Sequence, residues 1–149
     1  MCILGNIINV IMEEGIFRGL FQKLFEQKYN FLLSAILSSL LFGFWHVIAP
    51  LRSYYDGTIS FEEMFINIII LVVTSTLVGL KFSMMTKLTG SLYMSMGDHF
   101  VNNSIINILH IVSKDGSIDK LSVMRISIAQ TLSFLIILIY FKLSRNECS

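Results

Sequence analysis

The chain has 149 residues, of which 54% are hydrophobic and only 14% charged, and its formal net charge at pH 7 is +1. Soluble domains carry about 25% charged residues, so this composition excludes an ordinary soluble protein and predicts a membrane protein. The small net charge points to no nucleic-acid partner. The two cysteines, Cys2 and Cys148, stand at opposite ends and predict neither a disulfide framework nor a metal site.

Five segments are long and apolar enough to cross a bilayer core of about 30 Å as helices. In chain order they are about Ile3 to Phe25, Phe31 to Ala49, Phe61 to Phe82, Leu88 to Val112 and Val123 to Leu143. The second is expected to end at Pro50, because the residue before a proline disfavours helix. The connectors are expected at Glu26 to Asn30, Leu51 to Ser60, Ser83 to Lys87 and Ser113 to Ser122.

These segments predict an all-α fold, a polytopic transmembrane bundle of about five membrane helices in one domain spanning 1–149. The first, second and fourth segments carry strongly polar residues and are expected to line a water-accessible cavity. The third and fifth are plainly apolar and are expected to form the lipid-facing wall. We therefore expect an integral, multi-pass membrane protein, and the bias toward Ile, Lys and Asn suggests a bacterial cell membrane.

Basic residues are distributed unequally between the two sides of this expected topology. One side collects Lys23, Lys28, Lys81, Lys87, Lys142 and Arg145, and the other has Arg52, Lys114, Lys120 and Arg125. Cytoplasmic connectors carry an excess of lysine and arginine, so the first group predicts the cytoplasmic face. We call that face the basic side.

Ionisable side chains interrupt three of the apolar segments, and each segment has one pair of residues spaced four apart that includes at least one of them. The pairs are Glu14 with Arg18, Phe42 with His46, and His99 with Asn103. This spacing places both members of a pair on one face of a helix. Charged or polar groups in hydrocarbon are costly unless they are paired or face water, so such residues suggest a functional site.

The depth of these residues favours a single site. Counted from the basic side, Glu13 is about 13 residues into its segment, His46 about 15 and His99 about 11. At a helical rise of about 1.5 Å per residue, all three lie roughly 16–23 Å deep. Polar groups from three separate segments at one depth can form one constellation.

The two adjacent glutamates are expected to have different roles, because neighbouring residues on a helix point about 100° apart. Glu14 reaches Arg18 on the next turn, and such a pair neutralises itself and holds the helix against its neighbours. Glu13 then faces the cavity. A desolvated carboxylate near an imidazole can serve as general base toward water.

The remaining polar residues complete a hydrolytic set. His46 could orient or polarise the water, and His99 and Asn103 offer N–H donors to one point, as an oxyanion hole requires. No serine or cysteine stands in a recognisable nucleophile context. The set therefore predicts hydrolysis of an amide or ester without a covalent intermediate.

The three motifs, EEGIFR, FGFWH and HFVNN, together resemble the CPBP (CAAX protease and bacteriocin-processing, or Abi) family of intramembrane proteases. Its patterns EExxxR, FxxxH and HxxxN match here in family order over roughly residues 10 to 105. The resemblance implies a glutamate-type intramembrane endopeptidase without a cofactor. It assigns water activation to Glu13 and His46, the oxyanion hole to His99 and Asn103, and support to Glu14 and Arg18.

The resemblance also implies partners and organisation. Eukaryotic members of this family trim the last three residues of prenylated CAAX proteins, and prokaryotic members are linked to bacteriocin self-immunity, peptide maturation and membrane-protein cleavage. We therefore expect a peptide or membrane-protein substrate within the lipid bilayer. Family members usually carry further helices ahead of the EExxxR helix, so the expected domain lacks upstream helices or is a short form.

Three other readings stay open at this point. Glu13, His46 and His99 would make an acceptable catalytic zinc shell with an open position, although no HExxH motif is present. A membrane bundle that binds a bacteriocin without catalysis would use the same polar cluster for packing and specificity. Asp98 and Asn102, each one residue before a motif residue, could support the site from behind.

Overall fold

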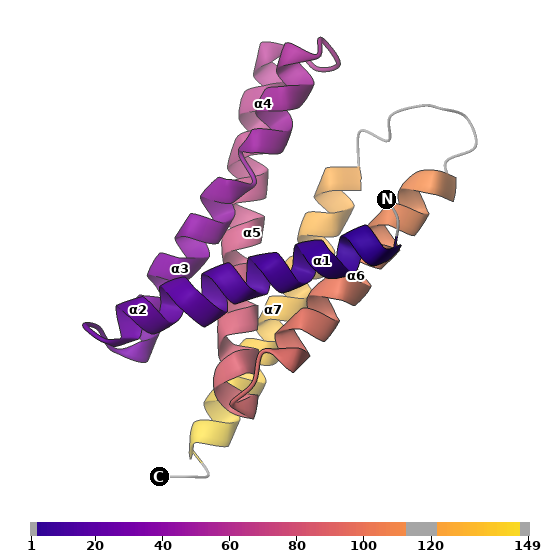
Figure 1. Ribbon diagram of the computed structural model, residues 1–149. Coiled ribbons are helices and arrows are strands. Elements are labelled where there is room, and N and C mark those ends of the chain that lie inside the picture. Colours follow the sequence, from indigo (N-terminus) through magenta and orange to yellow (C-terminus); the bar gives the residue numbers. More distant parts are fainter. Residues whose placement is uncertain (1–2, 113–121, 147–149) are drawn as a thin grey trace.

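The computed structural model describes residues 3–112 and 122–146, and within these ranges the chain is all-α, as predicted (Figure 1). Its helices are α1 (Ile3–Glu14), η1 (Gly15–Phe21), α2 (Gln22–Glu26), α3 (Phe31–Trp45), α4 (Ile48–Tyr55), α5 (Phe61–Thr89), α6 (Tyr93–Val112) and α7 (Ser122–Asn146). Cys2, Cys148, Lys114 and Lys120 lie outside the described residues.

The first predicted segment forms one uninterrupted helix, because α1, η1 and α2 follow one another without a break. Its middle part, Gly15–Phe21, is a π-helix, whose backbone hydrogen bonds span five residues instead of four. π-Helical turns are rare and are frequently found at functional sites. This one starts directly after the two glutamates and contains Arg18.

The second segment ends earlier than predicted. α3 stops at Trp45, His46 and Val47 form a turn, and α4 begins at Ile48. Pro50 lies in the first turn of α4, where a missing backbone N–H costs nothing, so the predicted helix end at Pro50 is wrong. His46 is therefore the C-cap of α3, at the point where the helix is interrupted.

The third segment is longer and more central than predicted. α5 starts at a capping box formed by Ser60 and Glu63 and ends at Gly90, whose φ of 67° is left-handed, so the expected connector Ser83 to Lys87 is helical. α5 touches η1, α3, α4, α6 and α7 (Figure 1).

The predicted lipid-facing wall holds for only part of α5. Its N-terminal half exposes large apolar side chains, including Phe65, Ile69 and Val73. The half from Ser75 to Met85 is largely buried and belongs to the core. The fifth predicted segment is α7, which packs mainly on α5 and exposes Ile128, Leu132, Ile136 and Ile139.

Small residues let α3 and α5 approach closely. A Cβ atom on Gly43 would come within 2.8 Å of the Val72 carbonyl oxygen, and one on Gly79 would come within 2.9 Å of the Ser39 side chain. Side chains of this size allow helix backbones to pack tightly in membranes. The α3–α5 pair thus forms the frame against which the N-terminal helix packs.

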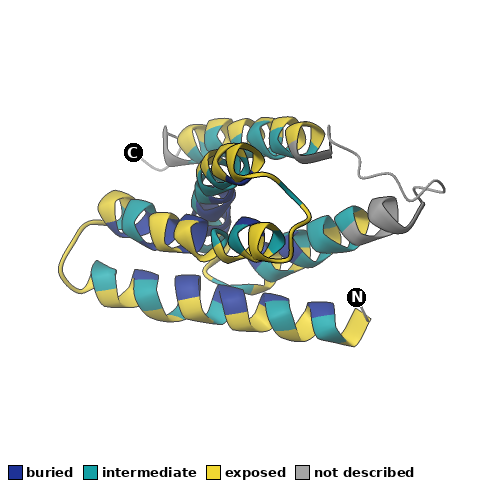
Figure 2. Cartoon of the chain, turned by 90° about the horizontal axis from the view of Figure 1, so that it is seen from above, coloured by how far each residue is buried: buried dark blue, intermediate teal, exposed yellow. Residues whose placement is uncertain are grey.

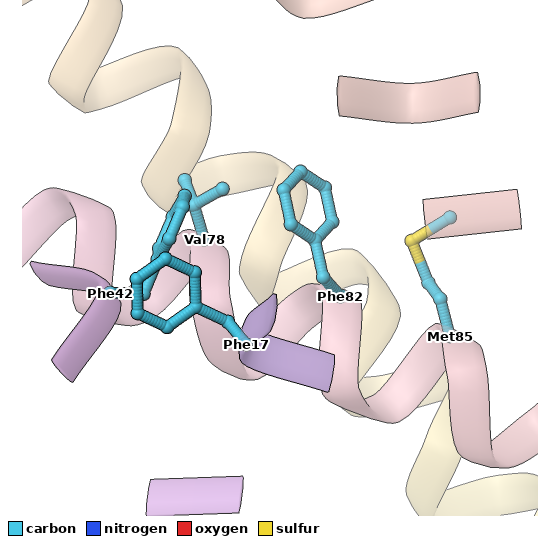
Figure 3. Packing of buried hydrophobic residues seen from close by; sticks show 5 residues of the cluster. All are labelled: Phe17, Phe42, Val78, Phe82 and Met85. Carbon is cyan, nitrogen blue, oxygen red and sulfur yellow. The ribbon is translucent and has the colours of Figure 1, made fainter. Parts of the chain in front are cut away.

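The hydrophobic core joins three elements at one place. It consists of Phe17, Phe42, Val78, Phe82 and Met85 (Figure 3). The Phe17 ring from η1 meets the Phe42 ring from α3 edge-on, with 5.2 Å between their centroids. The aromatic residues of the first two motif helices are therefore packed together on α5.

The surface of the molecule suits a bilayer. In the described part of the chain, three stretches are long and apolar enough to cross a membrane: Phe31–Tyr55, Phe61–Thr89 and Met124–Ser144. The helix from α1 to α2 also exposes a row of apolar side chains, including Ile7, Ile11, Leu20 and Leu24, and Figure 2 shows the exposed outer side of α1. These features indicate an integral membrane protein, while the count of five crossings stays a prediction.

We expect Gly79→Ala to lower the free energy of unfolding by about 1–3 kcal/mol, because the new methyl group overpacks the α3–α5 contact. It would meet Ser39 and the Arg18 guanidinium, both at 2.9 Å. Thermal unfolding in detergent micelles measures the effect. The control is Gly5→Ala in α1, where nothing lies within 4 Å of the new Cβ. Equal melting temperatures for the two variants would contradict the close packing.

Candidate active site

A fully buried ion pair lies where the π-helix begins. Arg18 Nη1 is 3.2 Å from Glu14 Oε1, and both side chains are completely inaccessible to solvent. The guanidinium carbon also lies 4.3 Å from the ring centroid of Phe42 and 5.2 Å from that of Phe82. Arg18 is thus held between a carboxylate and two aromatic rings, which compensate for the loss of its hydration.

His99 of α6 extends this pair into a chain of charged groups. Its Nδ1 is 3.0 Å from Glu14 Oε1, and its Nε2 is 3.4 Å from Glu13 Oε2. The ring is only 4% exposed. The other oxygen of Glu13 accepts a hydrogen bond of 3.0 Å from Asn9. The structure therefore brings both glutamates, Arg18 and His99 into one buried cluster, which we call the Glu–His–Arg cluster.

The contacts of His99 favour a doubly protonated ring. A carboxylate only accepts hydrogen bonds, and each ring nitrogen faces one, so both contacts are strongest when each nitrogen carries a proton. The formal charges of Glu13, His99, Glu14 and Arg18 then sum to zero. A neutral sum is what a cluster in a low-dielectric region requires.

His46 approaches the cluster from the end of α3. Its Nδ1 lies 2.8 Å from the Phe42 carbonyl oxygen, which can only accept, so Nδ1 carries a proton. In the neutral ring Nε2 is then a free acceptor for a water proton. The Phe42 ring lies between the two histidines, with centroids 4.7 Å from His46 and 6.0 Å from His99. Within the described residues no hydrogen bond or ion pair joins His46 to Glu13.

Asn103 lies one helical turn after His99 on α6 and is half-buried. It makes no hydrogen bond with His99 or Glu13 in the described structure. α6 is held on α1 beside it, because Asn6 donates to Ser104 Oγ at 3.0 Å and to the Phe100 carbonyl at 3.4 Å. The seam between α1 and α6 thus holds the helix that carries His99 and Asn103 against the helix that carries Glu13.

The polar neighbours of the motif residues fix the rotation of α6 instead of touching the cluster. Asp98 pairs with Lys81 of α5, and Asn102 accepts from Gln130 of α7. Lys81 is 2% exposed and also donates to Ser133 at 3.2 Å. The prediction that Lys81 lies on the basic side is therefore wrong, since its ammonium group is buried between α5, α6 and α7.

Several residues of the site were missed by sequence reasoning. The contact of Asn9 with Glu13 could have been predicted, because Asn9 precedes Glu13 by four residues and so lies on the same helix face. No sequence pattern indicated the role of Phe82, whose ring stacks on the ring of His99 with 5.1 Å between centroids. Lys81 was detectable as a lysine inside an apolar helix, but the short expected helix placed it at the membrane surface.

A catalytic zinc ion bound by Glu13, His46 and His99 stays a prediction. Among the residues that the structure describes, no three His, Cys, Asp or Glu side chains gather in an arrangement that could hold a metal ion. Both nitrogens of His99 face glutamates, whereas the described hydrogen bond of His46 goes to the Phe42 carbonyl oxygen.

Comparison with known protein families identifies the class of this membrane protein. Residues 1–105 match the family model described as Rce1-like, type II CAAX prenyl endopeptidase Rce1-like. The match covers the three motifs, and the chain belongs to this protease family. At the family level it is therefore a CAAX-type intramembrane endopeptidase. Searches of curated proteins and of solved structures found no match.

We expect Arg18→Met to lower the free energy of unfolding by about 3 kcal/mol, because Glu14 loses its buried cation. The double variant Arg18→Met/Glu14→Gln should recover part of that loss, since it buries no unpaired charge. Thermal unfolding in micelles compares the two. A double variant less stable than Arg18→Met would contradict the view that Glu14 needs Arg18 for its charge.

Proposed function

We propose that the chain cleaves peptide bonds in membrane-associated substrates by direct attack of a water molecule that Glu13 activates. His46 orients this water, and His99 and Asn103 hold the oxyanion. Glu14 and Arg18 support His99. The substrates are CAAX-type proteins, bacteriocin or leader peptides, or other membrane-associated chains, and no cofactor takes part.

The proposed reaction takes place in a few steps, and the contact between Glu13 and His99 supports it. Glu13 accepts a proton from water while the water oxygen attacks the carbonyl carbon of the scissile bond. The resulting oxyanion receives hydrogen bonds from His99 Nε2–H and the Asn103 amide. When the C–N bond breaks, Glu13 returns its proton to the leaving amine.

The observation that carries this proposal is the position of His99 between the two glutamates. Its 3.0 Å contact to Glu14 is of ordinary hydrogen-bond length, while the 3.4 Å contact to Glu13 is long. A substrate carbonyl oxygen can replace Glu13 as the acceptor for Nε2–H without disturbing the tight contact. Glu13 is then released as a base beside the carbonyl that His99 polarises.

We expect Glu13→Gln to lower kcat for peptide cleavage about 10²–10⁴-fold, because the near-isosteric amide cannot accept the proton. We expect His99→Ala to lower it about 10²–10³-fold through loss of an oxyanion donor. Purified protein in liposomes and a fluorescent isoprenylated peptide provide the assay. Glu62→Gln is the matched control, since it makes the same change at an exposed position in the first turn of α5.

A strong chelator separates the remaining alternatives in the same assay. Cleavage that chelator abolishes and zinc restores would move the mechanism to a metal site built on Glu13, His46 and His99. If wild type cleaves no peptide and a bacteriocin-immunity phenotype survives Glu13→Gln, the chain is a binding protein and the proposal is wrong.

A further inference from the structure

Glu13, the base of the proposed reaction, has a second hydrogen-bond partner that the proposed chemistry does not use. Asn9 lies in α1, one helical turn before Glu13, and its Nδ2 is 3.0 Å from Glu13 Oε1. A carboxylate only accepts hydrogen bonds, so the amide group of Asn9 presents an N–H to this oxygen. The three motif pairs do not include Asn9, and its contacts are what indicates its role.

The face of α1 that carries Asn9 is fixed against α6. Asn6, Asn9 and Glu13 follow one another at spacings of three and four residues, so they share one face of the helix. Asn6 is 3% exposed and donates to Ser104 Oγ of α6 at 3.0 Å, and Glu13 contacts His99 of the same helix. α1 is therefore joined to α6 on both sides of Asn9 (Figure 1), which sets the direction in which Asn9 points.

Asn9 and His99 contact different oxygens of the Glu13 carboxylate. Asn9 Nδ2 is 3.0 Å from Oε1, and His99 Nε2 is 3.4 Å from Oε2. The first distance is ordinary for a hydrogen bond and the second is long. In the described part of the chain these two contacts hold the Glu13 side chain. The tighter of them comes from its own helix, and the looser one comes from α6.

The two contacts have different fates when a substrate binds. In the proposed reaction the substrate carbonyl oxygen takes the place of Glu13 Oε2 at His99 Nε2. Oε2 is then free to accept a proton from water, while Oε1 stays bound to Asn9. A general base must lie within about 2.6–3.2 Å of the group whose proton it takes. A glutamate side chain is flexible, so a hydrogen bond at Oε1 keeps the carboxylate in place while Oε2 reacts.

We propose that Asn9 is a positioning residue for the base: its amide holds Glu13 Oε1, so that Oε2 faces the attacking water and takes its proton. This inference rests on the proposed function. An O–H bond of water breaks and an O–H bond forms at Oε2. The same oxygen later gives the proton to the leaving amine, and Asn9 itself exchanges no proton.

The kinetic test replaces Asn9 by leucine, which has a similar size but no hydrogen-bond donor. We expect Asn9→Leu to lower kcat for cleavage of the isoprenylated peptide about tenfold, as for loss of one hydrogen bond to a charged group. KM should stay within about twofold, because the lost contact acts in the transition state and does not bind the substrate. Asn9→Gln keeps the amide donor on a side chain one carbon longer and should recover most of kcat.

Asn67→Leu is the matched control, because Asn67 is half-buried like Asn9 and lies on another helix. It precedes the core residue Val78 on α5 by eleven residues, which corresponds to about 16 Å. We expect wild-type kcat and KM for this variant. Thermal unfolding in micelles should give similar melting temperatures for Asn9→Leu and Asn67→Leu, so that the loss of kcat does not come from unfolding.

Two kinetic results would overturn the inference. In the first, Asn9→Leu keeps the wild-type kcat, which would mean that Glu13 needs no hold at Oε1. In the second, Asn9→Leu raises KM while it lowers kcat, and Asn9→Gln recovers neither. Asn9 would then contribute only to the packing of α1.

Nitrogen-15 NMR of asparagine-labelled protein detects the contact without turnover and keeps the two proposals distinguishable. The Nδ2 signal of Asn9, identified by its absence in Asn9→Leu, should move in Glu13→Gln, because a neutral amide accepts a weaker hydrogen bond than a carboxylate. A wild type that cleaves no peptide overturns the proposed function and, with it, the role of Asn9, even where this signal moves. A wild type that cleaves while the signal stays in place in Glu13→Gln overturns the inference alone.

Discussion

The structure depends on burying four ionisable side chains so that their charges cancel. Arg18 is fully inaccessible and its partner Glu14 equally so, which would be prohibitive for either group alone. His99 joins this pair to Glu13 and supplies the second positive charge when doubly protonated. The same contacts that make burial tolerable also point a ring nitrogen of His99 and a carboxylate oxygen of Glu13 toward one another.

Backbone geometry and close helix packing bring the four buried ionisable side chains together. The π-helix over Gly15–Phe21 follows the two glutamates directly and carries Arg18 inward. Gly79 leaves the space that the guanidinium occupies beside Ser39. The pair of Lys81 with Asp98 holds α6 against α5, so that the next residue, His99, reaches the glutamates. The aromatic rings of Phe42 and Phe82 enclose the charges and limit water near Arg18.

Patterns along the sequence predicted much of the helical fold and part of the Glu–His–Arg cluster. Apolar length indicated five helical segments, and i,i+4 spacing predicted the contact between Glu14 and Arg18. The interruption at His46 escaped prediction, because nothing in an apolar stretch shows where a helix turns, and Pro50 suggested a later end. The burial of Lys81 and the stacking of Phe82 on His99 depend on contacts between distant helices, which spacing along one helix cannot reveal.

The charge state of His99 tests the central claim most directly. Nitrogen-15 NMR of ring-labelled protein in a bilayer distinguishes a protonated from a bare ring nitrogen at each position. The account predicts from the two glutamate contacts that both nitrogens of His99 carry protons and that Glu14→Gln removes one of them. A singly protonated ring in the wild-type protein would contradict the charge-balanced cluster on which the proposed chemistry rests.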